Sequence, residues 1–371
     1  MNPLDLARPE IRALEPYSSA RMEARGGSIL LNANESPWPP FACNTTWNRY
    51  PEPQPSALAV RLAGLYGVGV DQLLIGRGSD EVIDLLVRAF CAAGHDAILI
   101  SSPTFGMYAV CARIQGADIV DVPLRADFSL DVDAMLAAVT PAVKLVFVCA
   151  PNNPAGAGAP RAGILRLAEA LAGNALLVVD EAYVEFVDPA GEFGSVAGHI
   201  GNIPNLVTLR TLSKAWALAG LRIGTLLADA RVVALLRKLM PPYPLAAPCV
   251  DVAMNALSDD GERVVRERID TIRRERARVR ETLATLGCVH EVLPSQANFL
   301  TVRFDDSGAA YAALLDAGVL VRDVRRYPML EDALRITLGT PHENDRVLAL
   351  LRSLEVARNV SSWAARAELP A

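Results

Sequence analysis

Short, almost wholly apolar runs alternate with helical patterns between residues 70 and 230. Continuous apolar runs of this length predict strands that are buried on both faces. Between them, the spacing of apolar residues predicts helices, for example over 79–92 and 161–172. This alternation is typical of a mostly parallel sheet with helices on both sides. The seven predicted strands span 71–76, 96–102, 117–124, 143–150, 175–180, 205–210 and 222–228.

The pattern changes after about residue 240. A proline-rich stretch at 240–248 breaks any helix, and one long helical pattern then covers 259–286. Between 259 and 281 it carries eight arginines and seven acids, so we interpret its charged face as solvated rather than as a nucleic-acid contact. A smaller α+β unit follows, with strands over 298–304 and 334–339 and helices over 309–318 and near 343–357.

A chain of 371 residues has the length of about two domains. We expect a large α/β domain over 32–245, with a mostly parallel seven-stranded sheet. A small α+β domain would combine 246–358 with an arm formed by 1–31, and 359–371 would form a frayed tail.

Composition and charge narrow the class of protein. With 51% hydrophobic and 21% charged residues the chain is an ordinary globular protein, and its net charge of −6 argues against general nucleic-acid binding. No charge-free apolar run is long enough to predict a membrane span, and the N-terminus lacks the apolar region of a secretory signal. We therefore expect a cytoplasmic protein.

Cysteine and histidine give no sign of a metal site. The six cysteines have no close pair and are typical of free thiols in a reducing compartment, and the four histidines are isolated. No metal ligand is therefore predicted.

Polar residues follow several of the predicted strands, at the sheet edge where ligands bind in open α/β folds. Ser79 and Asp80 open a helix after Gly76 and Gly78, and free N–H groups at a helix start suit a phosphate. The glycine spacing is not that of a dinucleotide-binding loop, because Glu81 stands where a third glycine is needed. An ordinary helix cap explains this motif equally well.

Two further strands end in polar motifs. Asn153 precedes Pro154 after the strand 143–150, where a simple turn is the alternative. Asp180 ends an apolar strand, where a carboxylate is costly unless something pairs with it, although it could be only a capping acid. Tyr183, three residues later, offers a phenol.

Lysine is rare in this chain, and only Lys144, Lys214 and Lys238 are present. The first and last lie in surface-like surroundings. Lys214 follows a strand, stands next to Ser213 and precedes Arg222, and its small and apolar neighbours could lower its pKa by desolvation. An amine, a carboxylate, phenol and amide groups, and a phosphate subsite together indicate one ligand, pyridoxal 5′-phosphate.

The motifs also resemble a known family. In order, NANESPWPP, RYPEPQP, GRGSDE, PTFGMY, PNNPAG, DEAYVEF, TLSKAWALAGLR and LRITLGT are similar to those of histidinol-phosphate aminotransferases, pyridoxal-phosphate enzymes of fold type I. The resemblance runs from about residue 10 to 350. It implies transamination between L-histidinol phosphate and 2-oxoglutarate, a step of histidine biosynthesis, by a homodimer.

The resemblance also implies roles for individual residues. Lys214 would join the cofactor aldehyde and move the proton, Asp180 would pair with the ring nitrogen, and Asn153 and Tyr183 would hold the ring hydroxyl. Phe105 stands where the family often has a tyrosine stacked on the ring, so the stacking would remain without the phenolic hydrogen bond. The phosphate would be held by Ser79, Asp80, Ser213, Arg222 and, from the neighbouring subunit, Tyr50.

The substrate anion would be received by Tyr17, Arg322 and Arg335, because a guanidinium fork suits phosphate and carboxylate alike. From the residues alone, Arg335 could equally form an edge salt bridge.

Other functions would use the same scaffold. A threonine-phosphate decarboxylase or an aromatic amino-acid aminotransferase would use similar residues. A cofactor-binding transcription regulator would need a DNA-binding domain ahead of this scaffold, for which we see no room. A binding module without activity would be expected to lack Lys214 or Asp180, and both are present.

Overall fold

A computed structural model describes residues 2–16, 31–41 and 45–367, and the side chains as far as 354. Its larger sheet has seven strands in the order β1-β7-β6-β5-β4-β2-β3. The neighbours from β3 to β6 pair in parallel, whereas β7 runs antiparallel to β1 and β6. The strands are β1 Leu73–Gly76, β2 Ala97–Ile100, β3 Asp118–Asp121, β4 Val143–Cys149, β5 Leu176–Asp180, β6 Leu206–Thr211 and β7 Gly224–Leu227.

The central strands are mostly apolar because helices cover both faces of the sheet. Along β5, Leu177 and Val179 join one buried cluster while Leu176 and Val178 join another. Successive side chains of a strand point to opposite faces, so both faces require apolar residues. The helices are α1 Pro9–Arg12, α3 Ser56–Tyr66, α4 Ser79–Phe90, α5 Met107–Gln115, α6 Val132–Ala137, α7 Arg161–Ala170, α8 Ala230–Arg237, α9 Ala247–Ala256, α10 Asp259–Leu283, α11 Ser307–Asp316 and α12 Pro341–Ala367.

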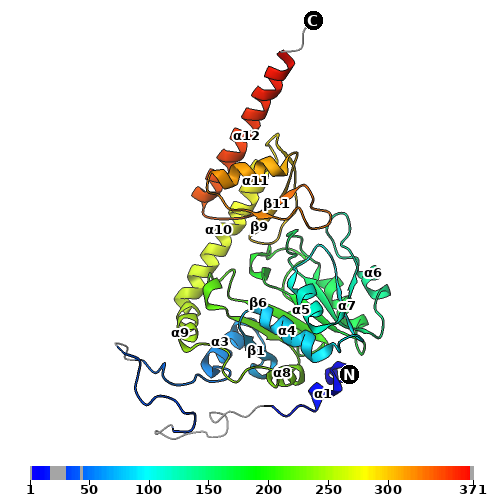
Figure 1. Ribbon diagram of the computed structural model, residues 1–371, viewed down its shortest axis with the longest axis vertical. Coiled ribbons are helices and arrows are strands. Elements are labelled where there is room, and N and C mark those ends of the chain that lie inside the picture. The colour runs from blue at the N-terminus through cyan, green and yellow to red at the C-terminus, as the bar shows by residue number, and fades with distance from the viewer. Residues whose placement is uncertain (1, 17–30, 42–44, 368–371) are drawn as a thin grey trace.

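A second, smaller sheet is antiparallel, in the order β10-β11-β9-β8. In Figure 1 the long helix α10 runs from the large sheet to this smaller unit, where α11 and α12 cover the second sheet. Val279 and Leu283 near the end of α10 join the core of the smaller unit. The four strands are β8 Val289–Val292, β9 Phe299–Phe304, β10 Arg322–Asp323 and β11 Ala333–Thr337.

The predicted α/β class and the mostly parallel seven-stranded sheet are confirmed. The proline-rich stretch was expected to break any helix, yet Pro248 lies in the first turn of α9. Proline is tolerated there because the first helical N–H groups have no intrahelical acceptor. The last helix reaches Ala367 rather than ending near 357, and 368–371 lie outside the described residues.

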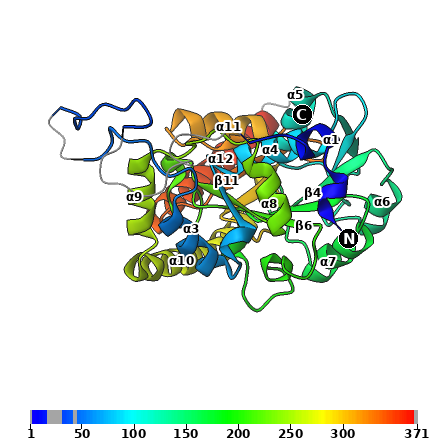
Figure 2. The same cartoon turned by 90° about the horizontal axis from the view of Figure 1, so that it is seen from below.

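The first residues pack differently from expectation. An arm over 1–31 was expected on the small domain, but the described residues 3–12 lie against helices of the large sheet. Leu6 and Ala7 belong to the core cluster around α4 and α8, and the Arg8 N–H donates to the Ala89 carbonyl at 3.1 Å. Figure 2 shows α1 close to α4, on the side of the molecule away from α10. The apolar side chains of this segment are buried against the apolar faces of α4 and α8, and that burial stabilises its position. The domain boundaries themselves remain predictions.

Among the described residues, no helix has both the length and the apolar character needed to cross a lipid bilayer. Cys91, Cys111, Cys149, Cys249 and Cys288 are free thiols, and Cys43 lies outside the described residues.

Candidate active site

The central parallel strands end at one edge of the large sheet. Cys149 of β4 pairs with Asp180 of β5, and Asp180 pairs with Leu209 of β6. The segments that follow these strands carry Asn153, Tyr183 and Lys214, so three motifs far apart in the sequence begin from aligned positions. The carboxyl edge of a parallel sheet is where such groups converge on a ligand.

Asp180 is a buried carboxylate with two donors. It is 3% exposed, its Oδ2 accepts a hydrogen bond from the Tyr108 hydroxyl at 2.7 Å, and its Oδ1 accepts one from the Ala182 N–H at 3.1 Å. Burial raises the pKa of Asp180, and both hydrogen bonds oppose that rise because they favour the charged form. A carboxylate with only neutral donors in such a place is suited to pair with a cationic group of a ligand.

The loop after β5 is fixed by a buried ionic cluster. Arg210 lies 3.1 Å from Glu181 and 2.8 Å from Glu185, and Glu181 also accepts the Ser195 hydroxyl at 2.7 Å. Both Glu181 and Arg210 are buried, and breaking such a pair would leave an uncompensated charge. The loop that carries Asp180 and Tyr183 is therefore held in one conformation.

Two arginines of α10 hold the far end of this loop, the 3-10 turn η3 (Val184–Phe186). Arg276 of α10 donates to the carbonyl groups of Phe186 and Ala297, both at 2.9 Å. Arg273, one turn earlier, donates to the carbonyl groups of Glu185 and Val187. The loop after β5 is thus connected to the helix that leads to the smaller unit.

Tyr183 lies between the lysine and the second sheet. Its ring meets Phe299 of β9 edge-on, with 5.3 Å between centroids, and the Lys214 Nζ lies 5.5 Å from the Tyr183 centroid. The Tyr183 phenol is buried, which raises its pKa and keeps it protonated at neutral pH. A protonated phenol beside an amine can donate a hydrogen bond to a ligand that the amine holds.

The second sheet contributes arginines to the same place. Arg335 of β11 lies 5.0 Å above the Phe299 ring, and its Nη1 donates to the Asn153 Oδ1. Its Nε is buried and has no hydrogen-bond partner among the described residues. Arg322 of β10 stands directly opposite Arg335 in the sheet register. Like charges placed opposite each other are destabilising unless an anion joins them, so this pair favours an anionic ligand.

The start of α4 forms a compact turn against β7. Gly78 precedes the helix with φ +84°, and no side chain caps the helix at that position. Gly224 at the start of β7 is so close that an added Cβ would come within 2.4 Å of the Ser79 nitrogen. The absent side chain is what allows strand and helix start to meet.

Three further polar groups surround this helix start. The Arg222 Nη2 lies 3.3 Å from the Asp80 Oδ2, and the Arg222 Nη1 donates to the Ser213 Oγ at 3.5 Å. Ser79, Asp80, Ser213 and Arg222, predicted together, are therefore neighbours. Helix N–H groups, a hydroxyl and a guanidinium suit a phosphate.

The pKa of Lys214 is lowered by arginines on both sides of the site. Desolvation lowers its pKa most, and the charges of Arg335 and Arg222 lower it further, while Asp180 and Asp80 act in the opposite direction. Its side chain is nevertheless exposed enough to meet a ligand. A lowered pKa increases the fraction of the neutral amine, which is the form that reacts with an aldehyde.

Phe105 joins the site through Tyr108. The two rings meet edge-on with 5.6 Å between centroids, and Tyr108 itself stacks on Phe147 at 4.6 Å. Phe105 is half-buried, so part of its ring remains available to a ligand.

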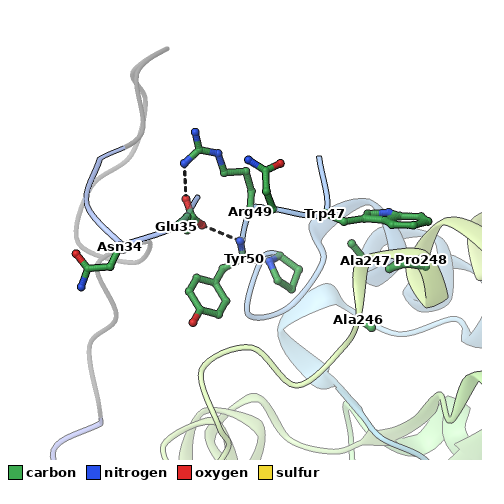
Figure 3. Close-up of a pocket in the computed structure, with 10 residues that line it drawn as sticks. Asn34, Glu35, Trp47, Arg49, Tyr50, Ala246, Ala247 and Pro248 are labelled. Atoms are coloured by element: carbon green, nitrogen blue, oxygen red, sulfur yellow. Dashed lines mark hydrogen bonds and ion pairs between the residues drawn. The ribbon is translucent and has the colours of Figure 1, made fainter. Parts of the chain in front are cut away.

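Tyr50 stands apart from this cluster. Tyr50 is 49% exposed and stacks on Tyr243 at 4.5 Å, and its N–H donates to Glu35 at 2.7 Å. Figure 3 shows Tyr50 and Glu35 beside a pocket of about 410 Å³ between the early chain and residues 246–248. Tyr17 lies outside the described residues.

Sequence reasoning missed Tyr108, Arg210 and Phe299. Tyr108 lies inside a helix rather than after a strand, and Phe299 reads as an ordinary strand residue. A signal did exist for Arg210, because Glu181 stands next to Asp180 at the end of an otherwise apolar strand, and two adjacent acids there favour a nearby cation.

Known proteins are similar to this chain in both sequence and fold. The family model described as aminotransferase class I and II matches residues 28–351. The histidinol-phosphate aminotransferase of Xanthomonas euvesicatoria pv. vesicatoria is 54% identical over 95% of this chain and 98% of its own length.

Two solved structures extend the comparison. The histidinol-phosphate aminotransferase from Sinorhizobium meliloti in complex with pyridoxal-5′-phosphate is 27% identical, with a TM-score of 0.74 over 83% of each chain. The L-threonine-O-3-phosphate decarboxylase from Porphyromonas gingivalis is 26% identical, with a TM-score of 0.69 over 83% of this chain and 92% of that one. The fold is therefore shared by enzymes of different reactions, whereas the high sequence identity is to histidinol-phosphate aminotransferases.

Proposed function

Because the chain belongs to the aminotransferase class I and II family, we propose that it transfers an amino group between L-histidinol phosphate and 2-oxoglutarate with pyridoxal 5′-phosphate as cofactor. The observation that carries this proposal is one arrangement of side chains. Lys214, the buried Asp180 and the arginine pair Arg322 and Arg335 belong to one cluster of contacts and charges at the edge of the large sheet.

The residues present fit the cofactor at each of its polar groups. When bound, pyridoxal phosphate supplies an aldehyde for the amino group and a cationic ring that withdraws electrons. The turn of Ser79, with Ser213 and Arg222, would hold the phosphate, and Asp180 would pair with the ring nitrogen. Asn153 and Tyr183 would donate to the ring hydroxyl, and Phe105 would cover one face of the ring.

Lys214 would be both the covalent anchor and the proton carrier. Its lowered pKa leaves more of the neutral amine at neutral pH. After release from the anchor, the Lys214 Nζ would take the proton from the substrate carbon that bears nitrogen and return a proton on the other side of the transfer. The Tyr183 ring, 5.5 Å from this nitrogen, limits the positions that the Nζ can occupy.

The substrate subsite would be built for an anion. Among Lys214, Arg222, Arg322, Arg335, Asp80 and Asp180, the cations outnumber the carboxylates four to two, although the whole chain is acidic. Arg335 keeps a buried Nε free of partners among the described residues. The phosphate of histidinol phosphate and a carboxylate of glutamate would bind here in turn, since each half-reaction places one anion at this site.

The active unit would be a homodimer in which Tyr50 reaches the partner's cofactor phosphate. The side chains of Tyr50 and the neighbouring Trp47 are large and well exposed, at 49% and 47% respectively. Exposed aromatic residues grouped in this way indicate a protein contact. The cytoplasmic location likewise remains a proposal.

Steady-state rates with three amino donors test the proposed reaction. L-Histidinol phosphate, phenylalanine and threonine phosphate would each be given with 2-oxoglutarate, and carbon dioxide release would be followed for the last. We expect kcat/KM to be at least tenfold higher for histidinol phosphate. A higher value for phenylalanine would indicate an aromatic aminotransferase, and release of carbon dioxide from threonine phosphate would indicate a decarboxylase.

A further inference from the structure

Tyr108, the last residue of the motif PTFGMY, contacts the buried carboxylate of Asp180, and the sequence alone assigned it no role. Its side chain is completely buried, and its hydroxyl donates to the Asp180 Oδ2 at 2.7 Å. The two residues are 72 positions apart in the sequence. The hydroxyl is therefore placed by the fold, where α5 packs on the large sheet.

The Tyr108 ring has little freedom to move. It stacks on Phe147 of β4 with an interplanar angle of 14° and meets Phe105 edge-on at 82°. Two aromatic contacts at right angles fix both the plane and the tilt of the ring. The hydroxyl cannot leave Asp180 without breaking this packing.

The Tyr108 hydroxyl is one of only two donors that the described residues offer to the Asp180 side chain, the other being the Ala182 N–H. Desolvation raises the pKa of Tyr108 well above its usual value, so the phenol stays a donor at any working pH. Four other titratable groups influence Asp180 or are influenced by it. They are Asp80 of α4, Cys149 of β4, Lys214 after β6 and Tyr183 after β5.

We propose that Tyr108 is a positioning residue that holds the Asp180 carboxylate in its charged form and in fixed orientation toward the cofactor ring nitrogen, while its edge contact aligns Phe105 with the ring face. This inference rests on the proposed function for its ligand. The hydrogen bond itself belongs to the chain alone and can be tested without cofactor.

The test uses Tyr108→Phe in the full-length chain, because phenylalanine keeps the ring packing and removes only the hydroxyl. In the cofactor-free chain, thermal unfolding is followed from about pH 4 to pH 8. Burial raises the pKa of Asp180 in the folded chain above its unfolded value, so the folded chain loses stability as the pH rises from the unfolded pKa to the folded pKa. The hydroxyl offsets this cost only for the charged form. The Tm deficit of the variant should therefore grow with pH, by about 2 °C or more.

Two controls separate this effect from packing. In an Asp180→Asn background the pH-dependent part of the Tyr108→Phe effect should disappear, because the amide carries no charge. Tyr311→Phe makes the same chemical change in α11 of the smaller unit and should show no pH-dependent deficit. A deficit that is the same at every pH would overturn the proposal and leave Tyr108 as a packing residue.

Cofactor binding provides the second readout. Loss of a charge-assisted hydrogen bond should weaken pyridoxal-phosphate binding by about tenfold to a hundredfold and shift the pH at which the bound cofactor changes its absorbance. An unchanged Kd together with an unchanged absorbance titration would contradict the proposal. If the unaltered chain binds no pyridoxal phosphate, the proposed function fails, whereas the cofactor-free measurement still decides whether Tyr108 supports Asp180.

Discussion

The role of a side chain in this site depends on its position in the fold as well as on its residue type. Arg335 and Arg303 lie on the neighbouring strands β11 and β9, and each has a buried Nε without a hydrogen-bond partner among the described residues. They differ in charge pairing, because Arg303 lies 3.4 Å from the Glu291 carboxylate whereas Arg335 donates to the neutral side chain of Asn153. Desolvation lowers the pKa of Arg335, as for a cation placed for an anion that arrives later.

Arg335→Ala should therefore weaken histidinol phosphate and glutamate alike. A charge-assisted contact worth about 1.5–3 kcal/mol corresponds to a fall in kcat/KM of roughly tenfold to a hundredfold for each half-reaction. Single-turnover rates with each donor measure the two effects separately. Arg303→Ala is the matched control and should leave both rates near normal. The shared anion subsite would be wrong if only one donor were affected.

The residues expected to touch a ligand could be found in the sequence because most follow an apolar strand. Lys214 stood out since the chain has only three lysines, and Asp180 because a carboxylate ending an apolar strand needs a partner. The residues behind them could not be found in this way. Tyr108 closes the motif PTFGMY, but its contact with Asp180 forms only through tertiary packing across 72 positions, so the motif does not indicate its partner.

At the scale of elements, the apolar runs predicted all seven strands of the large sheet. Most of these strands are buried on both faces and leave a continuous apolar signal, whereas the edge strand β3 is partly exposed. The strands β8 and β10 gave no such signal. The side chains of β8 are partly exposed, and β10 has only two residues, which pair because β11 lies beside them. The helix α9 was missed because its proline was interpreted as a breaker.

The contact between β7 and α4 gives an element-scale prediction. Gly224→Ala would place a methyl group within 2.4 Å of backbone atoms of Gly78 and Ser79, and backbone cannot rotate away. We expect at least a tenfold loss of pyridoxal-phosphate affinity and about 1–3 kcal/mol lower stability, from the displaced helix start. Equilibrium dialysis and thermal unfolding measure the two.

Gly198→Ala is the control for this change, because an added Cβ at Gly198 meets no atom within 4 Å. That variant should bind cofactor normally. Normal cofactor affinity in Gly224→Ala would show that the helix start does not hold the phosphate.

For the whole molecule, the segment around Tyr50 is the part whose proposed role depends on a second copy of the chain. In Figure 1 the segment that carries Tyr50 extends away from the body, near the lower end of α9. Within the chain, the Glu35 carboxylate accepts hydrogen bonds from the Arg49 side chain and the Tyr50 N–H, so it joins the motifs NANES and RYP. The sequence could not reveal this link, since Glu35 and Tyr50 lie 15 positions apart.

A mixed dimer tests whether Tyr50 acts across subunits. Tyr50→Phe and Lys214→Ala chains, unfolded together and re-associated, should form dimers with one site that has both Lys214 and a partner Tyr50. That site should regain normal pyridoxal-phosphate affinity and up to half the activity of the unaltered dimer. If Tyr50 acts within its own chain, the mixed dimer would reach at most half the activity of the Tyr50→Phe homodimer.

The central claim is that one lysine among three, placed after β6 beside Tyr183 and between Asp180 and two arginines, carries the chemistry. Borohydride reduction of the protein with bound pyridoxal phosphate, followed by mass spectrometry of the peptides, tests it most directly. We expect a single labelled peptide that contains Lys214, and no label in Lys214→Ala. A label on Lys144 or Lys238, or stoichiometric labelling that persists in Lys214→Ala, would contradict it.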